Sequence, residues 1–576
     1  MRVTISRSKS AEQVYITKAY RDETGKSTSK IIKKLGSMAS LLPEHDNDRE
    51  KVLAWAKELA EEYTRAEKNN TLKLSIDLSE DKQISFNEIR TCDGGYLFLQ
   101  RIFYELGLDD ICKDICKDHG FEYDLSQILA CLIYERILSP SSKLSSFFSM
   151  QHMLKKPSFK LHDLYRALDV LDEESDLIQS ILYKRNRAKR NTSVLYYDCT
   201  NFFFEIEEES GIRKYGRSKE HRPNPIVQMG LFMDGDGIPL AFSIFPGNES
   251  EQPTLIPLEK TLLSDFAMSK FIVCTDAGLS SYVNRKFNDR ADRAYVVTQS
   301  LKTLKSHIKE WALSPYGFRL KGDEREYDIT QIDENIHFND IFYKERWINE
   351  NGLEQRLVVT YSPKHRHYQS QIRSRQVERA AKILQSGKRN CTHNPNSPDR
   401  FIEEMQITID GQIAEKTVMS LDAEKIAEES RYDGYYCVST NLEGSVQDIL
   451  RINRGRWEIE ESFRMMKSEF QARPVYLQKD SRIRAHFMTC FLSLIVFRTL
   501  EKKLDSRFTS GEILRTLREM KFQKVKGIGY MPGYTRTEIT DALHEVFGFH
   551  TDREIITEEN MKKILILILT TTIIKI

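Results

Sequence analysis

The pattern of apolar and polar positions divides the chain into β-rich and helical stretches. Near the N-terminus, the segments MRVTISR and QVYITKAYRD alternate in polarity, which is typical of strands with one buried face. The following segment, EHDNDREKVLAWAKELAEEYTRAEK, has apolar residues at helical spacing. Residues 1–80 are therefore expected to form a small β/α unit that begins with a β-hairpin.

Residues 81–190 have a helical period throughout. The segments GGYLFLQRIFYELGLDDICKDI and LSQILACLIYERILSP place apolar residues three and four positions apart. This pattern predicts a helical module. Such modules often contact DNA, but the segment has no recognition-helix signature, and helix packing alone explains the pattern equally well.

The pattern changes to strands after Arg190. TSVLYYDCTNFFFEI is followed by two strand-like runs joined at the turn DGDG, then by the helical TLIPLEKTLL and the strand-like KFIVCTDAGLSS. We therefore expect an α/β core over 191–300. Residues 301–435 are expected to form a mostly β insertion with one basic helix, and the core is expected to resume over 436–500. Residues 501–576 are expected to be helical with an apolar tail, ILILILTTTIIKI, which would form a final strand, a dimer element or the aberrant end of a reading frame.

Composition narrows the class of protein. The sequence is 40% hydrophobic and 30% charged, as in globular proteins and unlike disordered ones. The net charge of +1 gives no global sign of a nucleic-acid partner, so such a partner must be argued from local patches. The nine cysteines lack the spacing of a zinc site, and MRVTISRSKS lacks the apolar segment of a signal peptide. No apolar run is long enough to span a bilayer. The sequence thus predicts a cytoplasmic protein without a membrane partner.

Two aspartates follow apolar strand-like segments. Asp198 ends SVLYYD, and Asp276 ends FIVCTD. Ligands of open α/β sheets bind at the carboxyl ends of the strands. Either aspartate alone could simply cap the next turn, but two such strands in succession favour a functional pair.

A third carboxylate lies in the segment INRGRWEIEESFRMMKSEF. If residues 452–470 form one helix, Glu460 shares a face with the basic residues Arg456, Arg464 and Lys467, beside the apolar stripe. Glu458 and Glu461 are expected to point away as solvated charges. Ordinary ion pairing between Arg456 and Glu460 would explain the pairing, but not the position of the basic cluster at the edge of the core.

Three such carboxylates suit metal-dependent phosphoryl chemistry. Two metal ions about 3.5–4 Å apart, held by acidic ligands, can activate a hydroxyl nucleophile and stabilise the leaving oxygen of a phosphodiester. Hard oxygen ligands favour Mg²⁺. Neighbouring basic side chains would then hold the DNA phosphates.

At this point the sequence resembles the DDE transposases of prokaryotic insertion sequences, in the branch with a Tyr-x2-Arg-x3-Glu-x6-Lys signature. Arg456, Glu460 and Lys467 match its spacing, whereas Asn453 stands where the tyrosine would be. YYDCTNFFFE, IVCTDAGLSS and RYDGYYCVSTN resemble other family segments in the family's order, and the similarity runs from about 190 to 500.

The resemblance implies a ribonuclease-H-like fold and a cut-and-paste DNA transposase. Asp198, Asp276 and Glu460 would be the catalytic residues and would bind two Mg²⁺ ions, for which Mn²⁺ could substitute. The enzyme would hydrolyse DNA at the element ends and then join the freed 3′-hydroxyl to target DNA by transesterification. Its partners would be the terminal inverted repeats and the target duplex, bound by a homodimer on paired ends in the prokaryotic cytoplasm, associated with the nucleoid.

Several further residues are expected to contact DNA. Trp457 would stack on an unpaired base or, as the more common role, pack in the core. The expected DNA contacts are Arg456, Arg464, Lys467, Asn453, Trp457, Arg217, Lys219 and Arg222 of a basic loop, and Arg373 and Arg375 of the basic helix. Two alternatives stay open: a ribonuclease-H-like nuclease without strand transfer, and a non-enzymatic DNA-binding protein derived from a transposase. The three intact carboxylates argue against the second.

Overall fold

The computed structural model describes residues 1–7, 12–21, 27–68, 80–81, 83–290, 292–386, 397–407 and 416–570. Within it, the chain divides into two compact units, Met1–Glu88 and Ile89–Ile576. The first unit is a three-stranded antiparallel sheet in the order β1-β2-β3, followed by two helices. Its elements are β1 (Arg2–Arg7), β2 (Glu12–Arg21), β3 (Ser27–Ser37), α1 (Met38–Leu41) and α2 (Arg49–Lys68). Alternate residues of β2 meet one face of α2, so Val14 and Val52 lie in the same small core.

The second unit opens with a helical module. Its helices are α3 (Tyr96–Glu105), α4 (Leu108–His119), α5 (Leu125–Leu138), α6 (Lys143–Ser149), α7 (Leu161–Glu173) and α8 (Ser175–Asn186). Helix α5 is buried along nearly its whole length, because it is apolar on all sides.

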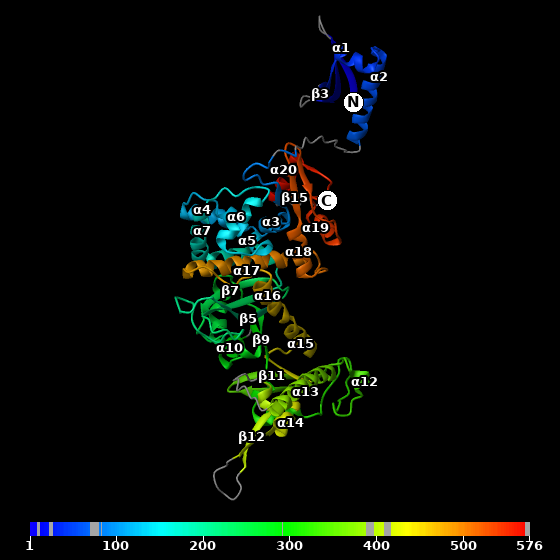
Figure 1. Cartoon of the computed structure of the whole chain (residues 1–576). Helices are drawn as coiled ribbons and strands as arrows, with labels where there is room; N and C mark the ends of the chain where they lie inside the picture. Colours follow the sequence, from blue (N-terminus) through cyan, green and yellow to red (C-terminus); the bar gives the residue numbers. More distant parts are fainter. Residues whose placement is uncertain are drawn as a thin grey trace. The chain divides into compact units, whose positions relative to one another are not determined.

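One long helix from the C-terminal half completes this module. Helix α17 (Asp480–Lys503) packs against α3, α5 and α7 and also against strand β7 (Pro239–Pro246), so it lies between the helical module and the main sheet (Figure 1). Its length and composition would allow it to cross a membrane, but 83% of its most apolar window is buried inside the protein. It is therefore a core helix.

The main sheet has eight strands in the order β10-β11-β14-β9-β8-β5-β6-β7. Strands β5, β8 and β9 are mutually parallel, and the other neighbours are antiparallel. The remaining bounds are β5 (Val194–Phe203), β6 (Ile226–Asp234), β8 (Phe271–Thr275), β9 (Arg293–Thr298), β10 (Phe342–Glu350), β11 (Leu353–Tyr361) and β14 (Tyr435–Thr440). Helices α9 (Leu255–Ser264) and α10 (Tyr282–Asn288) lie in the connections that lead to β8 and β9.

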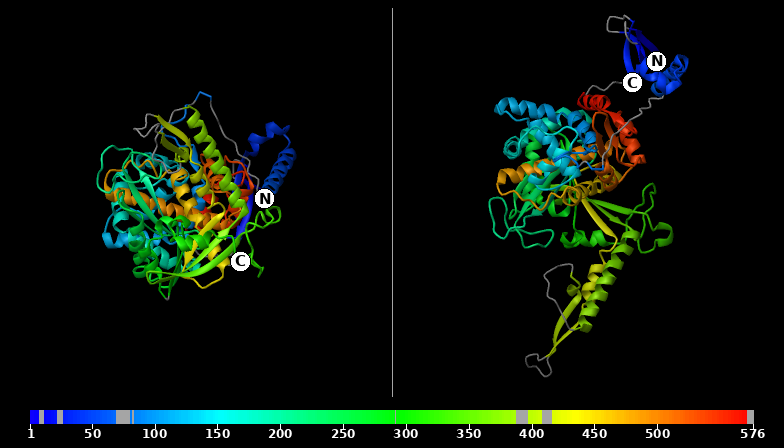
Figure 2. Two further views of the ribbon diagram at one scale, coloured as in Figure 1. Left: turned by 90° about the horizontal axis from the view of Figure 1, so that it is seen from below. Right: turned by 45° about the horizontal axis from the view of Figure 1, so that its top comes forward.

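The insertion is mixed, not mostly β as the sequence pattern suggested. Strands β10 and β11 extend the main sheet, whereas β12 (Ile402–Ile407) and β13 (Lys416–Leu421) form a separate hairpin. The 24-residue basic helix α13 (Pro363–Ser386) runs beside that hairpin (Figures 1 and 2). The other helices of the insertion are α11 (Ser306–Leu313), α12 (Glu334–His337) and α14 (Ala423–Ser430).

The C-terminal region combines helices with a small four-stranded sheet, where the sequence pattern predicted helices. The sheet has the order β17-β16-β15-β4, so the early strand β4 (Thr91–Asp93) pairs with a strand some 430 residues later. The other elements are α15 (Val446–Gly455), α16 (Trp457–Ser468), α18 (Ser510–Glu519), β15 (Lys521–Val525), β16 (Gly529–Pro532), α19 (Glu538–Phe547), β17 (Ile556–Thr557) and α20 (Glu558–Leu569). The apolar tail begins inside α20, so a strand is wrong for its first half; residues 571–576 lie outside the described part.

Candidate active site

The main sheet places Asp198 and Asp276 side by side. In the parallel pair β5–β8, Val194 faces Ile272 and Tyr196 faces Cys274. Two further positions along both strands bring Asp198 opposite Asp276, on the same face of the sheet. This register brings the two aspartates together. The sequence of the strand ends alone does not reveal it.

Asp198 does not end its strand, contrary to the sequence-based expectation. Strand β5 continues to Phe203, paired only with β6, whereas β8 stops at Thr275. Asp198 therefore lies where β5 extends beyond its parallel neighbour. Asp276 follows β8 directly, and its Oδ1 accepts a hydrogen bond of 3.0 Å from the Leu279 N–H. Asp276 thus also caps the next turn, and this cap leaves its position beside Asp198 unchanged.

Burial raises the pKa of Asp198 to about 6, and the neighbouring Asp276 charge adds to this, while Lys219 and Arg456 oppose it. The Asp198 Oδ1 accepts a 2.7 Å hydrogen bond from the Cys199 N–H. The Lys219 ammonium donates to the Cys199 carbonyl and pairs with Glu251 at 3.0 Å. Asp198 is therefore a desolvated carboxylate beside a second one, which is an environment that attracts cations.

The third carboxylate, Glu460, lies on α16 beside the same strand. The expected single helix is two, because α15 ends at Gly455 and α16 begins at Trp457. A Cβ added at Gly455 would lie 2.1 Å from the Tyr196 hydroxyl oxygen of β5. The absence of a side chain at Gly455 therefore lets the junction between the helices approach β5.

Two basic residues of this region connect Glu460 to the aspartate pair. Arg456 forms an ion pair with Glu460 at 3.5 Å, and the same guanidinium charge acts on Asp198. Burial lowers the pKa of Lys467 to about 8; Lys219 lowers it further and Asp198 opposes the change. Arg456 and Lys467 thus lie within electrostatic range of Asp198, and Glu460 lies between them on α16.

The three carboxylates do not form one tight cluster. Glu460 has 57% of its side chain exposed, on the solvent side of Arg456. Among the residues that the structure describes, the group of metal-ligating atoms that all lie within 4.8 Å of one another is a different one, His544, His550 and Asp552 of the C-terminal region. The arrangement at Asp198 is therefore a pair of aspartates with a third, solvent-facing carboxylate nearby.

The positions of Glu458 and Glu461 contradict the helical-wheel prediction, because neither is fully solvated. Glu458 is half-buried, with burial raising its pKa, and its carboxylate lies 3.9 Å from Arg498 of α17. Glu461 is half-buried and accepts from Arg464, which lowers its pKa. The helical-wheel prediction for these two glutamates was wrong because it considered one helix alone. It could not include α17, which covers this side of α16.

Asn453 differs from its expected role, and Trp457 differs from the more common of the two roles expected for it. Asn453 is only 8% exposed, and its Nδ2 donates to the Tyr436 hydroxyl at 3.0 Å, so it joins α15 to β14 and is not a DNA contact here. Trp457 is 57% exposed, so core packing, the role expected more often, is wrong. Its indole is free to stack on a base.

The remaining expected DNA contacts divide into paired and open cations. Arg373 is held by Asp433, with one hydrogen bond of 2.6 Å, and is largely buried, so it is not available as a DNA contact. Arg464 pairs with Glu461 but remains largely exposed. Arg217, Arg222 and Arg375 are exposed, and Arg222 also lies 4.2 Å from the centre of the Phe203 ring.

Sequence reasoning did not predict a contact between the basic loop and the end of the α16 region. Glu220 of the basic loop pairs with Arg473 and lies 3.6 Å from Lys467. These partners are some 250 residues apart in the chain, so no local pattern could reveal them. They fix the basic loop of Lys219 against the segment that follows α16.

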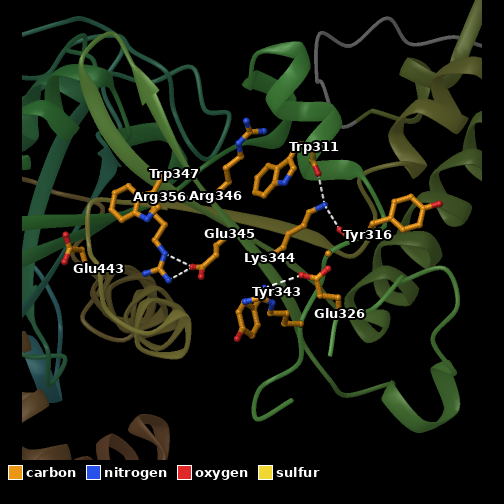
Figure 3. Close-up of a pocket in the computed structure, with 12 residues that line it drawn as sticks. Trp311, Tyr316, Glu326, Tyr343, Lys344, Glu345, Arg346, Trp347, Arg356 and Glu443 are labelled. Atoms are coloured by element: carbon orange, nitrogen blue, oxygen red, sulfur yellow. Dashed lines mark hydrogen bonds and ion pairs between the residues drawn. The ribbon is translucent and has the colours of Figure 1, made fainter. Parts of the chain in front are cut away.

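A large cavity lies away from the carboxylates, along strand β10. It measures about 670 Å³ and is lined by aromatic and charged side chains, among them Trp311, Tyr316, Lys344 and Trp347 (Figure 3). Most of its charges have partners in the protein: Lys344 donates to the carbonyls of Trp311 and Ser314 at 2.7 and 2.6 Å, and Arg356 pairs with Glu345. Most of the charge in this cavity is therefore already paired within the protein.

Comparison with protein families identifies the chain. The model of the transposase DDE domain matches residues 201–496. The chain belongs to this family. The match includes Asp276 and Glu460 and begins just after Asp198. The transposase is therefore a DNA-transposing enzyme of a family that generally uses divalent metal ions.

Two solved structures are similar to parts of the transposase. One is the cryo-EM structure of a piggyBac transposase synaptic complex with hairpin DNA, with 8% identity, coverage of 84% of this chain and 87% of that chain, and a TM-score of 0.35. The other is a Mos1 transposase paired-end complex with left transposon end, with 13% identity, 40% and 63% coverage, and a TM-score of 0.13. Comparison with curated proteins gives no match.

Proposed function

We propose that this transposase moves an insertion sequence by a cut-and-paste reaction. DNA at the element ends would be cleaved by hydrolysis, and the freed 3′-hydroxyl would then be joined to target DNA by transesterification. The observation that carries this proposal is the β5–β8 register, which sets Asp198 beside Asp276 close to the basic helix that bears Glu460.

We propose that the catalytic core is a ribonuclease-H-like fold. Three strands meander antiparallel in β5, β6 and β7, and the parallel β8 and β9 follow on the other side of β5. We assign this fold to these five strands, with β14, β11 and β10 as extensions that frame the insertion.

The donor set fits divalent metal ions. Asp198 and Asp276 are adjacent, desolvation raises the pKa of Asp198, and all three proposed ligands are hard carboxylate oxygens. This chemistry favours Mg²⁺, with Mn²⁺ as a substitute. When bound, the metal would lower the pKa of the attacking hydroxyl and stabilise charge on the leaving oxygen.

The protein's own groups would bind and orient DNA. Lys219, Arg456 and Lys467 surround Asp198 and would neutralise the phosphate that enters the site. The exposed Trp457 would stack on an unpaired base beside it. Arg217, Arg222, Arg375 and Arg464 would contact the DNA backbone farther out.

The partners follow from this chemistry. The proposed substrates are double-stranded terminal inverted repeats and target DNA, bound by a homodimer that holds two ends, with no membrane partner. We propose that the protein acts in a prokaryotic cytoplasm and associates with the nucleoid when bound to DNA.

A strand-transfer assay tests the proposal. The full chain is given a pre-cleaved transposon end, a target plasmid and Mg²⁺. Asp198→Asn and Glu460→Gln should each lower joined product by at least about 100-fold while retaining DNA binding. Glu424→Gln, on the exposed surface of α14, is the matched control and should join at the wild-type rate.

Each alternative gives a different result. Cleavage without joined product would assign a nuclease. Unchanged DNA activity in Glu460→Gln would remove Glu460 from the catalytic set, and DNA binding without any strand cleavage in the wild type would assign a non-enzymatic DNA-binding protein.

A further inference from the structure

A second, smaller cavity lies between the helical module and the segment that follows α16. It measures about 230 Å³, and its lining includes Arg136 of α5, Lys143 of α6, His486 of α17, and Tyr476. The volume is several times the roughly 30 Å³ that one water occupies in the liquid. The cavity can therefore hold a group of several heavy atoms.

Lys143 lies in this cavity without a partner. Only 5% of the residue is exposed, and none of the residues in the described part of the chain gives its Nζ a hydrogen bond or an ion pair. Burial lowers the pKa of Lys143 to about 7, and the Arg136 charge lowers it further. A buried amine with no partner is costly, so its position calls for an explanation.

Arg136 adds a second buried cation to the same cavity. It is 4% exposed and donates to three backbone carbonyls, those of Phe470 at 3.1 Å, Gln471 at 3.2 Å and Ser141 at 3.2 Å. Its Nε has no hydrogen-bond partner among the groups that the structure describes. The guanidinium is thus held in place by neutral groups, and no carboxylate among the described lining residues neutralises its charge.

No carboxylate is among the described residues that line the cavity. His486 does not offset the cations either, because its Nε2 lies 2.9 Å from the Ala472 carbonyl and burial lowers its pKa well below the usual range. The larger cavity along β10 differs, since Lys344 and Arg356 are hydrogen-bonded or paired within the protein and carboxylates such as Glu345 belong to its lining. Of these two cavities, the smaller one combines two buried cations with space and with no carboxylate among its described lining residues.

We propose that this cavity binds a phosphate oxyanion, either a phosphodiester of bound DNA or free inorganic phosphate. A tetrahedral oxyanion supplies acceptors to the Lys143 ammonium, and the charge of the neighbouring Arg136 would add to the attraction; lysine and arginine are the usual phosphate-binding residues of proteins. The hydroxyl of Ser142, also in the lining, supplies a further donor. The two charges would then be neutralised by the ligand.

The position of the cavity favours DNA as one source, and this part rests on the proposed function. The segment that lines the cavity includes Val475 and Tyr476, and it begins just after Arg473, which pairs with Glu220 of the basic loop. Glu220 also lies near Lys467, whose ammonium is influenced by Asp198. A phosphodiester in the cavity would therefore tie the DNA to the same segment that borders the catalytic carboxylates.

The test uses the full chain and the variant Lys143→Met. Because Lys143 has no partner to lose, this variant should fold and should be at least as stable as the wild type without phosphate. Lys156→Met, at an exposed lysine of the same module, is the matched control. Inorganic phosphate should raise the melting temperature of the wild type and of Lys156→Met, but not that of Lys143→Met.

A second measurement uses the unmodified chain. An amine-acylating reagent at pH 7 should label Lys143, as mass spectrometry can locate, and inorganic phosphate should protect it. In a separate titration with end DNA, Lys143→Met should bind about 3- to 10-fold more weakly and lower the slope of log affinity against log salt by about one.

The outcomes separate the two sources of phosphate. Weaker DNA binding by Lys143→Met identifies a phosphodiester, whereas phosphate stabilisation with unchanged DNA binding identifies free phosphate. The proposal is overturned if phosphate neither stabilises the wild type nor protects Lys143, and Lys143→Met binds DNA as the wild type does. Failure of the proposed function would appear instead as absent strand transfer, because the phosphate assays need no catalysis.

Discussion

At the scale of single residues, the proposed catalytic site is a balance between like charges and nearby cations. Asp198 and Asp276 face the same side of two parallel strands, and desolvation makes ionisation of Asp198 harder. Lys219 and Arg456 oppose this effect, and Arg456 also pairs with Glu460. The Arg456 guanidinium therefore interacts with both Asp198 and Glu460.

Lys143 should make stability depend on pH in a predictable direction. Its pKa in the folded protein is about 7, below the usual 10.5, so the fold bears the full cost of burying a charged amine below about pH 7 and none above about pH 10.5. The groups that face it are Arg136, His486, Cys490, Tyr165 and Tyr476. Lys143→Met should therefore be more stable than the wild type by about 1–4 kcal/mol at pH 6, with the difference fading toward pH 10.

Urea unfolding at pH 6, 8 and 10 in a buffer free of phosphate measures this difference. Lys156→Met should show no such pH-dependent gain, because that side chain is exposed in the folded protein. A gain for Lys143→Met that is equal at all three pH values would show that the charge of Lys143 is not the cause.

Trp457 should contribute to DNA binding and little to stability. It is 57% exposed, so Trp457→Ala removes few protein contacts. If it stacks on an unpaired base, this variant should weaken binding to ends with unpaired bases by about 1–3 kcal/mol, roughly 5- to 150-fold. Fluorescence anisotropy with fully paired and frayed ends measures the effect, and Trp457→Phe should retain most of the affinity. Equal affinity of wild type and Trp457→Ala for frayed ends would exclude stacking.

The residue types of the site could be predicted from the sequence, but their surroundings could not. Strand-borne aspartates and the basic helix face follow from local patterns, and the family match includes Asp276 and Glu460. The burial of Asn453 and the pairing of Glu458 with Arg498 depend on β14 and α17, which are distant in sequence or absent from a single-helix wheel. Local periodicity records which face is apolar, not which element covers it.

At the scale of elements, the junction of α15 and α16 positions Glu460. The Gly455→Ala variant places a Cβ 2.1 Å from the buried Tyr196 hydroxyl oxygen, so either the junction or the Tyr196 ring must move. An alanine in an unstrained helix would instead stabilise it by up to about 1 kcal/mol. We expect a loss of about 1–3 kcal/mol in unfolding free energy and at least 10-fold slower strand transfer.

The matched control is Gly444→Ala, just before α15, where an added Cβ meets nothing within 4 Å. Chemical denaturation and the strand-transfer assay are run on both variants in parallel. If Gly455→Ala is as stable and as active as Gly444→Ala, close contact of the junction with β5 does not position Glu460.

Element types were easier to predict than element partners. The expected β-rich insertion does contain β11, yet the place of this strand in the main sheet was unexpected, because β11 pairs with β14, some 80 residues later. Strand β4 likewise pairs with β15 near the other end of the chain. A period of two predicts a strand with one buried face but carries no information on which strand lies beside it.

At the scale of the whole molecule, the two compact units should unfold independently. Residues 1–88 have their own core of Val14, Met38, Leu41, Val52 and Ala56, whereas β4 at the start of the second unit pairs with β15 near its end. We expect calorimetry of the full chain to show two transitions. Removal of residues 1–88 should eliminate one of them and leave the melting temperature of the other within about 2 °C, since each unit has a core of its own.

Removal of residues 501–576 is the contrasting truncation. Arg101 of α3 donates to the Leu567 carbonyl of α20 at 2.8 Å, and β15 supplies the partner of β4, so this deletion exposes the core of the helical module. It should abolish cooperative unfolding of the second unit, because buried residues such as Phe98 pack directly against Phe549. If the chain without residues 501–576 kept the transition of the second unit, while deletion of residues 1–88 removed it, the division into two units would be wrong.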